Sequence, residues 1–266
     1  VKLPAKSNSN KDTENNLQIS VDNLTTTKAC DELNCNLIDI GWRTWQEFKK
    51  KHISEDGRVI DYSDNRQITT SEGQSYAMFF ALVANEPESF ELLLRWTENN
   101  LAKGDLSNHL PAWLWGKNKD LWQVIDDNSA SDADLWITYC LFQAGKLWKK
   151  PHYTKMAMGL SHQIITKETT EIKPWGLTLL PAPYGFVKKD NGSGKLLSWK
   201  INPSYTPIQV LTSIATQTNN ESWFDLLEAS KKMLLSTSQN GFSADWVIVK
   251  AEDDLEKSNN FYQGDE

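Results

Sequence analysis

Residues 130–148 read ASDADLWITYCLFQAGKLW, and this stretch is the strongest indication of helical structure in the chain. It predicts a helix from Ser131 to Trp148, with Asp132 in the first turn. Cys140 lies in the apolar part of the run and is predicted to be a buried thiol. The stretch therefore indicates a domain with buried helices.

Segments on both sides show the same helical character. After Pro87, the apolar and small polar residues at helical spacing are Phe90, Leu93, Leu94, Thr97 and Leu101. The other predicted helices are Ser71–Ala84, Pro87–Leu101, Tyr153–Glu168, Tyr205–Thr216 and Trp223–Ser236. Strand-like alternation is scarce, and the connections are long and rich in aromatic residues, Pro and Gly. The pattern predicts an all-α fold in which the long loops carry function.

The composition excludes several classes of protein. There are 28 basic and 35 acidic residues, so the net charge is −7 and nucleic acid is not an expected partner. No run approaches the roughly 18 apolar residues of a membrane span. The 12 Trp residues are unusual. Because Trp has a flat apolar face and one N–H donor, this content is typical of surfaces that stack on sugar rings as well as of cores.

The N-terminal region has a different composition. Residues 1–36 are rich in Ser, Asn, Thr, Lys and Asp, which predicts a disordered polar leader. Cys30 and Cys35 lie in this region and would form a small disulfide in an oxidising compartment. The four His residues show no zinc-ligand spacing with a Cys pair, so no metal site is predicted.

Three polar residues stand at predicted helix starts. Glu72 follows Ser71, Asp132 follows Ser131 and Tyr205 follows Ser204, and each serine is a candidate N-cap. In a barrel of antiparallel helix pairs the inner helices run parallel, so their N-termini would meet on one rim. The alternative is that acidic residues stand at helix starts only because the helix dipole favours them there.

Several strings in order along the chain resemble glycoside hydrolase family 8. They are residues 56–61 (DGRVID), 71–76 (SEGQSY), 111–116 (PAWLWG) and 202–205 (NPSY). Residues 130–134 (ASDAD), followed by Ala144 and Trp148, resemble the signature of that family. The similarity extends from about Trp42 to the end. Within the family, the sequence most resembles the periplasmic endoglucanase that accompanies bacterial cellulose synthase.

This resemblance implies an (α/α)6 barrel of helical hairpins over residues 37–266, with an open cleft and with C-terminal helices of the barrel absent. It also implies inverting hydrolysis of β-1,4 glucan without a metal or other cofactor. By motif, Glu72 matches the general acid and Asp245, in the string 244–246 (ADW), matches the general base. Asp132 matches a carboxylate at the sugar-distorting subsite, and Tyr205 matches a tyrosine that helps to hold the nucleophilic water.

The implied chemistry makes two demands on these residues. Inversion requires acid and base carboxyl groups roughly 6.5–9.5 Å apart, so that a water molecule fits between the base and the sugar. The acid must also keep its proton near neutral pH, although a helix N-terminus lowers a carboxyl pKa. Burial beneath aromatic residues, or a neighbouring charge such as that of Asp132, would have to raise the pKa of Glu72 more.

Sugar binding is expected to use aromatic side chains in the loops. The stacking candidates are Trp113, Trp115, Trp122 and Trp199, with ordinary core packing as the alternative for each. Trp246 adjoins the predicted base and is a candidate for either role. Core positions are expected for Trp96, Trp136 and Trp148, because they lie inside predicted helices. Arg58 and Asp61 are expected to orient loops or the acid rather than to contact sugar.

Three functions compete at this point. The leading one is an endoglucanase that acts on cellulose, in the periplasm or outside the cell, in association with the cellulose synthase machinery. The second is a noncatalytic glucan-binding barrel. The third keeps the fold and the chemistry but changes the substrate to xylan, chitosan or mixed-linkage glucan.

Overall fold

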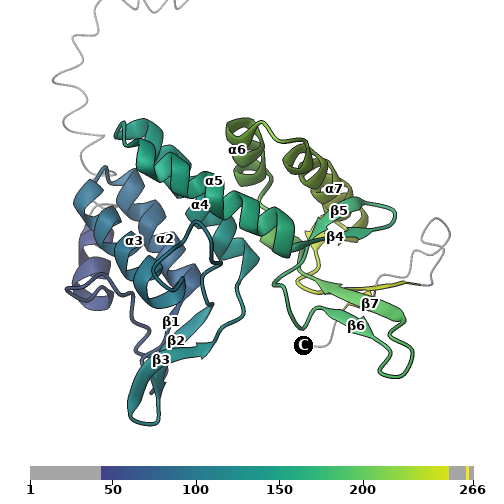
Figure 1. Cartoon of the computed structure of the whole chain (residues 1–266), viewed down its shortest axis with the longest axis horizontal. Helices are drawn as coiled ribbons and strands as arrows, with labels where there is room; N and C mark the ends of the chain where they lie inside the picture. The colour runs from purple at the N-terminus through teal and green to yellow at the C-terminus, as the bar shows by residue number, and fades with distance from the viewer. Residues whose placement is uncertain (1–42, 252–261, 264–266) are drawn as a thin grey trace, which may run out of the picture. The chain divides into compact units, whose positions relative to one another are not determined.

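The computed structural model describes residues 43–251 and 262–263, nearly all of which belong to the compact unit Trp45–Glu266. The predicted leader, the Cys30–Cys35 pair and residues 252–261 lie outside the described residues. The structure is mainly helical (Figure 1). Its main helices are α2 (Ser71–Val83), α3 (Pro87–Leu101), α4 (Ser131–Leu147), α5 (Pro151–Lys167), α6 (Ile208–Thr218) and α7 (Glu221–Thr237).

Helix α4 lies at the centre of the helical part, where it packs against α2, α5 and α6. Its first turn is buried, including the carboxyl-bearing residues Asp132 and Asp134. Cys140 is fully buried as predicted, and burial raises the pKa of its thiol. The predicted apolar face of α3 is buried as well, from Phe90 to Leu101.

One predicted helix is wrong in its first part. Residues Pro203–Tyr205 form a short 3-10 helix, η2, and α6 begins only at Ile208. Pro207 explains the interruption, because a proline disfavours helical backbone angles in the residue before it. Thr206 accordingly has φ −113° and ψ 66°. Tyr205 therefore ends a 3-10 turn instead of starting an α-helix.

The three predicted serine caps are displaced toward the N-terminus, by one residue for Ser71 and Ser131 and by two residues for Ser204. The N-cap of α2 is Thr70, whose hydroxyl accepts a hydrogen bond from the backbone N–H of Gly73, and Ser71 is the first helical residue. The N-cap of α4 is Ala130, which has no side chain to cap with, and Asn202 caps η2. Glu72 and Asp132 nevertheless lie in first turns, as predicted.

The segments between helices form antiparallel strands, which the sequence pattern did not predict because most are only two to four residues long and the six-residue strands show no regular alternation of buried and exposed residues. One sheet has the order β1-β2-β3 and contains β1 (Thr69–Thr70), β2 (Leu114–Asn118) and β3 (Leu121–Asp126). A second has the order β11-β10-β7-β6 and contains β6 (Val187–Lys189), β7 (Leu196–Ile201), β10 (Val247–Lys250) and β11 (Tyr262–Gln263). The other pairs are β4 (Thr169–Ile172) with β5 (Gly176–Leu179), and β8 (Ser238–Gln239) with β9 (Phe242–Ser243).

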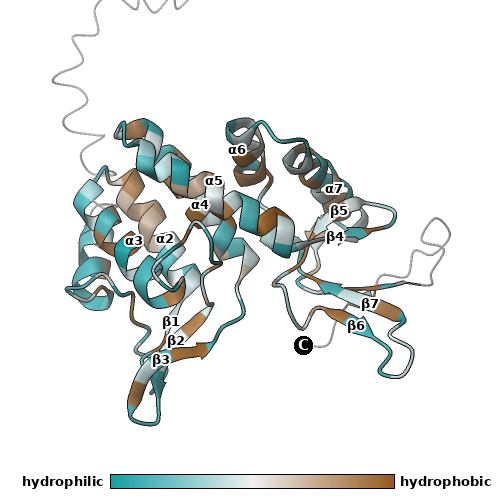
Figure 2. Cartoon of the chain, in the orientation of Figure 1, coloured by the Kyte–Doolittle hydropathy of each residue, from teal (hydrophilic) through white to brown (hydrophobic). Residues whose placement is uncertain are grey.

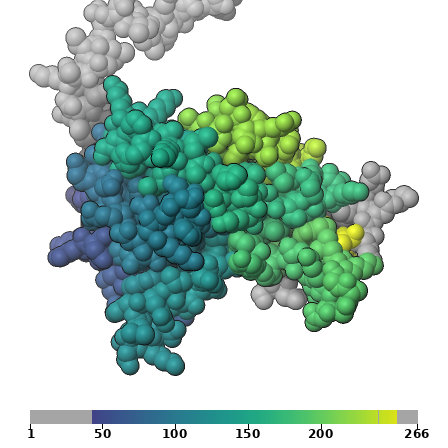
Figure 3. Space-filling view, in the orientation of Figure 1, coloured from purple at the N-terminus to yellow at the C-terminus, as the bar shows by residue number. Residues whose placement is uncertain are grey.

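The hairpin β2–β3 is hydrophilic at its tip, where residues 117–120 read KNKD, and more hydrophobic toward the helices (Figure 2). In the space-filling view this hairpin and the β6–β7 hairpin form separate projections (Figure 3).

Candidate active site

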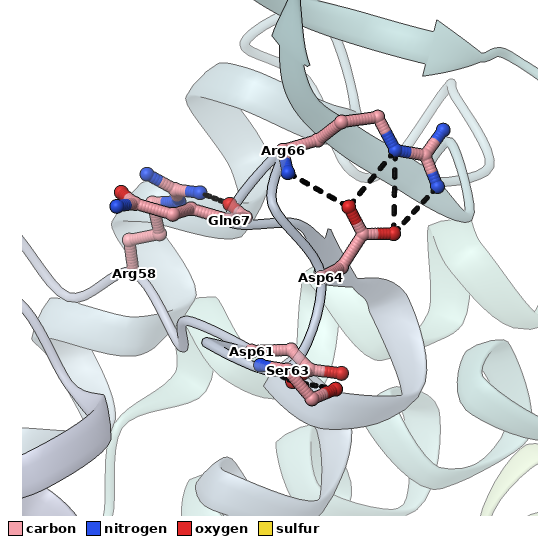
Figure 4. A network of polar contacts seen from close by, with 6 residues as sticks. All are labelled: Arg58, Asp61, Ser63, Asp64, Arg66 and Gln67. Carbon is pink, nitrogen blue, oxygen red and sulfur yellow. Dashed lines mark hydrogen bonds and ion pairs between the residues drawn. The ribbon is translucent and has the colours of Figure 1, made fainter.

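The segment before α2 is held by a buried guanidinium group. Arg58 donates from Nε to the Thr69 hydroxyl at 2.8 Å and from its terminal nitrogen to the carbonyl of Gln67. Nearby, Asp64 and Arg66 form an ion pair of 2.7 Å, and Asp61 accepts hydrogen bonds from Ser63 (Figure 4). The expectation that Arg58 and Asp61 organise loops fits these contacts, because the segment leads directly into Thr70 and Glu72.

Gln74 joins two of the sequence strings that carry the resemblance. Its side chain is fully buried, accepts a hydrogen bond from the Val59 N–H at 2.6 Å, and donates to the Thr97 hydroxyl at 2.9 Å. Gly57 lets the segment 56–61 lie close to the backbone of α3, because a Cβ at this position would be 2.3 Å from the carbonyl oxygen of Leu92. Residues 56–61 are thereby fixed to the first turns of α2.

Glu72 occupies the first turn of α2 and is half-buried. Burial raises the pKa of its carboxyl group, while hydrogen bonds from its own backbone N–H and from the Thr70 and Ser71 hydroxyls lower it. The net shift is upward, as the predicted acid requires. Burial therefore outweighs the local hydrogen bonds.

Asp132 and Tyr205 lie close enough to Glu72 to interact with its charge. Burial first, and then the charge of Glu72, raise the pKa of Asp132 to about 6. Burial, followed by the charges of Asp132 and Glu72, raises the pKa of Tyr205 to about 12. The predicted convergence of these residues is confirmed, although Tyr205 reaches the site from a 3-10 turn.

Tyr76 belongs to the same group of side chains, although its sequence context alone did not predict a place in the site. Burial and then the charges of Asp132 and Glu72 raise its pKa, and its ring meets Trp136 edge-on at 6.2 Å. Its position four residues after Glu72 was the available signal, because residues at that spacing share one face of a helix. Tyr76 is exposed and thus open to a ligand at this rim.

Asp245 lies in a bend just before β10 and is exposed. The next residue, Trp246, lies 6.2 Å from the ring of Tyr205 and stacks on Phe186 at 5.9 Å. The ammonium group of Lys200 lies 4.5 Å from the same indole ring. Trp246 therefore anchors the Asp245 bend beside Tyr205, and its ring is engaged by protein groups on several sides.

The other tryptophan candidates differ in their surroundings. Trp122 is exposed and stacks on the half-buried Trp115 at 5.4 Å, and the Arg58 guanidinium lies 4.4 Å from the Trp115 ring. Trp113 is half-buried, and its carbonyl oxygen accepts a hydrogen bond from the N–H of Ser71, beside Glu72, at 3.0 Å. Trp122 and Trp113 therefore remain stacking candidates, whereas the Trp115 ring is already contacted by Trp122, Trp96 and Arg58.

The prediction that Trp199 stacks on sugar is wrong. It is 9% exposed and belongs to a buried cluster with Ile172, Trp175, Ile201, Met233, Val247 and Val249. Strand β7 lies between β6 and β10 in its sheet. The buried cluster covers one face of this sheet, and Trp199 belongs to that cluster. Trp199 therefore packs in a core instead of offering a face to sugar.

The three tryptophans that were predicted to lie in the core differ in how deeply they are buried. Trp96 is buried, whereas Trp136 and Trp148 are half-buried. Trp148 follows the last turn of α4 and donates its Nε1–H to Asn85 at 2.8 Å. Its polar edge explains why it lies at the surface of the helical part.

We expect Trp113→Ala to weaken binding of cello-oligosaccharides by at least about tenfold, or about 1.4 kcal/mol. Trp199→Ala is the matched control: it should lower the free energy of unfolding by about 3–5 kcal/mol, because it leaves a cavity in a packed cluster. Calorimetric titration and thermal unfolding of both variants measure the two effects. A large loss of melting temperature in Trp113→Ala with unchanged affinity would assign Trp113 to the core.

Within residues 43–251 and 262–263, no group of three His, Cys, Asp or Glu side chains is arranged to hold a metal ion. No helix in that part of the chain combines the length and apolar character needed to cross a membrane.

Comparisons with known proteins agree with this picture. The model of glycosyl hydrolases family 8 matches residues 33–264. An endoglucanase of Salmonella typhi is 48% identical over 207 residues, which are 77% of this chain and 54% of that protein. The crystal structure of endo-1,4-D-glucanase from Vibrio fischeri ES114 has a TM-score of 0.73 and 44% identity, covering 80% of this chain and 61% of that chain.

A second solved structure, endo-beta-1,4-glucanase CMCax from Acetobacter xylinum, has a TM-score of 0.70 and 29% identity, covering 80% of this chain and 63% of that chain. These likenesses confirm the predicted (α/α)6 barrel as the fold class. The chain spans about half the length of the curated relatives it matches.

Proposed function

Because the chain belongs to glycosyl hydrolase family 8, we propose that it cleaves internal β-1,4 bonds of cellulose or a related glucan with inversion at the anomeric carbon. The observation that carries this proposal is the group formed by Glu72, Asp132 and Tyr205, in which burial raises the pKa of Glu72. The group stands at the starts of two helices and at a 3-10 turn, with Trp113 and Tyr76 next to it.

The proposed reaction uses two carboxyl groups. Glu72 donates its proton to the glycosidic oxygen while the bond from that oxygen to the anomeric carbon breaks. A water molecule attacks the anomeric carbon from the opposite face, and Asp245 takes the proton that this water loses. The new hemiacetal is the α anomer, and solvent returns both carboxyl groups to their starting states.

The remaining residues hold the sugar and the water. Asp132, with a pKa of about 6, is mostly ionised at neutral pH and accepts hydrogen bonds from sugar hydroxyls. Tyr205 keeps its proton, since its pKa is raised to about 12, and donates a hydrogen bond to the attacking water. Trp246 supports both Tyr205 and Asp245.

Two measurements test this function. The full chain should release reducing ends from carboxymethylcellulose with a rapid fall in viscosity, and proton NMR of the first products should show the α anomer. A β anomer would mean retention and another mechanism. Binding of glucan without any release of reducing ends would favour the noncatalytic barrel, and faster turnover of xylan or chitosan in a polysaccharide panel would change the substrate.

We also propose a periplasmic or secreted location and a role beside the cellulose synthase machinery. The sequence likeness to endoglucanases of that setting supports this, together with the Cys30 and Cys35 pair, which suits an oxidising compartment. Fractionation of the source cells tests the location, and recovery of the chain in the cytoplasmic fraction would contradict it.

A further inference from the structure

Two acidic side chains are completely buried behind the candidate active site. Asp134 lies in the first turns of α4, two residues after Asp132, and Glu168 is the residue that caps the C-terminus of α5. Both have no exposed surface. The mechanism proposed above uses neither of them, yet a buried carboxylate is costly unless it is paired.

The surroundings of the two groups require at least one of them to be protonated. Ser129 donates its hydroxyl to Oε1 of Glu168 at 2.5 Å, which holds the Glu168 carboxyl group at the start of α4, where its charge raises the pKa of Asp134. The other oxygens of the two groups, both of Asp134 and Oε2 of Glu168, receive no hydrogen bond from any N–H or hydroxyl group in the described part of the chain. Two ionised carboxylates buried together with so few donors would repel each other strongly, so at least one of them carries a proton.

The donor can be identified. Glu168 already accepts from Ser129, which stabilises its charged form, whereas no N–H or hydroxyl group of the described residues donates to the Asp134 carboxyl group. Asp134 is therefore the protonated partner that donates to Glu168. Burial, followed by the charge of Glu168, raises the pKa of Asp134 well above its usual range, and burial raises that of Glu168.

The pair joins the start of α4 to the end of α5. The carbonyl of Glu168 accepts from the N–H of Leu180 at 2.7 Å, and the N–H of Ser131 donates to the carbonyl of Pro181 at 2.9 Å. The segment after β5 thus binds both helix ends, and the shared proton closes the connection between them. Because Asp132 belongs to the same helical turn, its position depends on this connection.

Charged groups on three helices act on the pair. Glu72 on α2 and Asp132 on α4 raise the pKa of Asp134, Asp132 also raises that of Glu168, and Lys167 on α5 lowers that of Glu168. Ionised Asp132, Glu168 and Asp134 would be three negative charges close together, and these charges would repel strongly at low effective dielectric. Retaining a proton in the buried pair reduces this repulsion at the helix start.

We propose that Asp134 and Glu168 are positioning residues, which share a proton between their buried carboxyl groups and thereby hold the first turn of α4, with Asp132, against the end of α5. The catalytic consequence rests on the function proposed above, but the shared proton does not. An apolar pair would fill the same space without directing the α4 turn, and two ionised groups would push the helix ends apart.

The shared proton predicts a pH dependence of stability. The folded state keeps protons on the pair at pH values where the unfolded carboxyl groups, near pH 4, have already lost theirs. Stability is therefore fully present below the ordinary carboxyl range and falls as the pH rises toward the raised pKa values of the pair. The melting temperature of the full chain should decline between pH 5 and pH 9.

Asp134→Asn and Asp134→Ala separate a shared proton from simple packing. The asparagine amide still donates to Glu168 but cannot release a proton, so the melting temperature of Asp134→Asn should decline less with pH than that of the wild type. Asp134→Ala leaves Glu168 without this donor and should lower the melting temperature throughout. Asp225→Asn is the control, because Asp225 is exposed near the start of α7 and should not change the pH profile.

Kinetics complete the test. Asp134→Asn should keep kcat within about threefold of the wild type, whereas Asp134→Ala should lose kcat by roughly 10–100-fold with a smaller change in KM, because Asp132 is displaced. If Asp134→Ala does not fold, Glu168→Gln replaces it in the pH series and should also flatten the profile. The proposal would be overturned if the wild type and Asp134→Asn had equal pH profiles of melting temperature. It would also be overturned if Asp134→Asn lost as much kcat as is expected of Asp134→Ala. If the chain has no hydrolase activity but the wild type and Asp134→Asn still differ in the pH dependence of their melting temperatures, the proposed function is refuted and the proposed shared proton is supported.

Discussion

Glu72→Gln is expected to reduce kcat on β-1,4 glucan by at least about 10³-fold while cello-oligosaccharide binding stays measurable. Glutamine has nearly the same shape and can still accept hydrogen bonds from the Thr70 and Ser71 hydroxyls, but it has no proton to give the leaving oxygen. Rates on carboxymethylcellulose and a calorimetric titration with a cello-oligosaccharide measure the two quantities.

The control for this variant is Glu88→Gln, which changes an exposed acid in the first turn of α3 and should leave kcat unchanged. The wild-type rate should fall on the alkaline side as Glu72 loses its proton, and this fall should lie above the ordinary carboxyl range because burial raises the pKa of Glu72. Near-normal turnover of Glu72→Gln would remove Glu72 from the role of acid.

Asp245→Asn is expected to have a comparable effect on kcat, for a different reason. The amide cannot accept the proton from the attacking water, so the single displacement step loses its base. Asp245 is exposed in a bend, and the change should therefore leave the melting temperature nearly unaltered. Single-turnover rates and thermal unfolding of the same preparation check both statements.

Asp120→Asn, in the exposed turn between β2 and β3, is the matched control for Asp245 and should retain full activity. If Asp245→Asn keeps its activity, the base lies elsewhere. Asp253 and Asp254 are then the next residues to change, and both lie outside the described residues. Combined with Glu72→Gln, this pair of variants separates the acid from the base, because each leaves the other carboxyl group in place.

The local sequence was sufficient where a single segment decides the structure. Helix α3 has the predicted bounds, because Pro87 suits a first helical position and the apolar residues up to Leu101 recur on one face. The start of α6 was predicted too early, since the pattern of apolar residues was followed through Pro207. The short strands were missed because strands of a few residues show no clear alternation, and hydrogen bonds to distant segments define them.

For the candidate site, the strings around Glu72, Asp132, Tyr205 and Asp245 were enough to nominate the polar residues. Sequence could not rank the tryptophans, because Trp113 and Trp199 both lie beside matched strings, and only the packing of β7 against its cluster shows that Trp199 is buried. Nor could it find the contact between Asp134 and Glu168.

The amino-acid sequence alone determined the family, the helical class and the carboxyl groups that stand at helix starts, because these depend on residue identity and on spacing within one segment. The tertiary structure alone decided the environments of those groups. Burial raises the pKa of Glu72, and the meeting of α4 with the end of α5 places two acids where a proton must be shared. Desolvation and charge repulsion depend on which atoms surround a group in space, and no local pattern of residues specifies that.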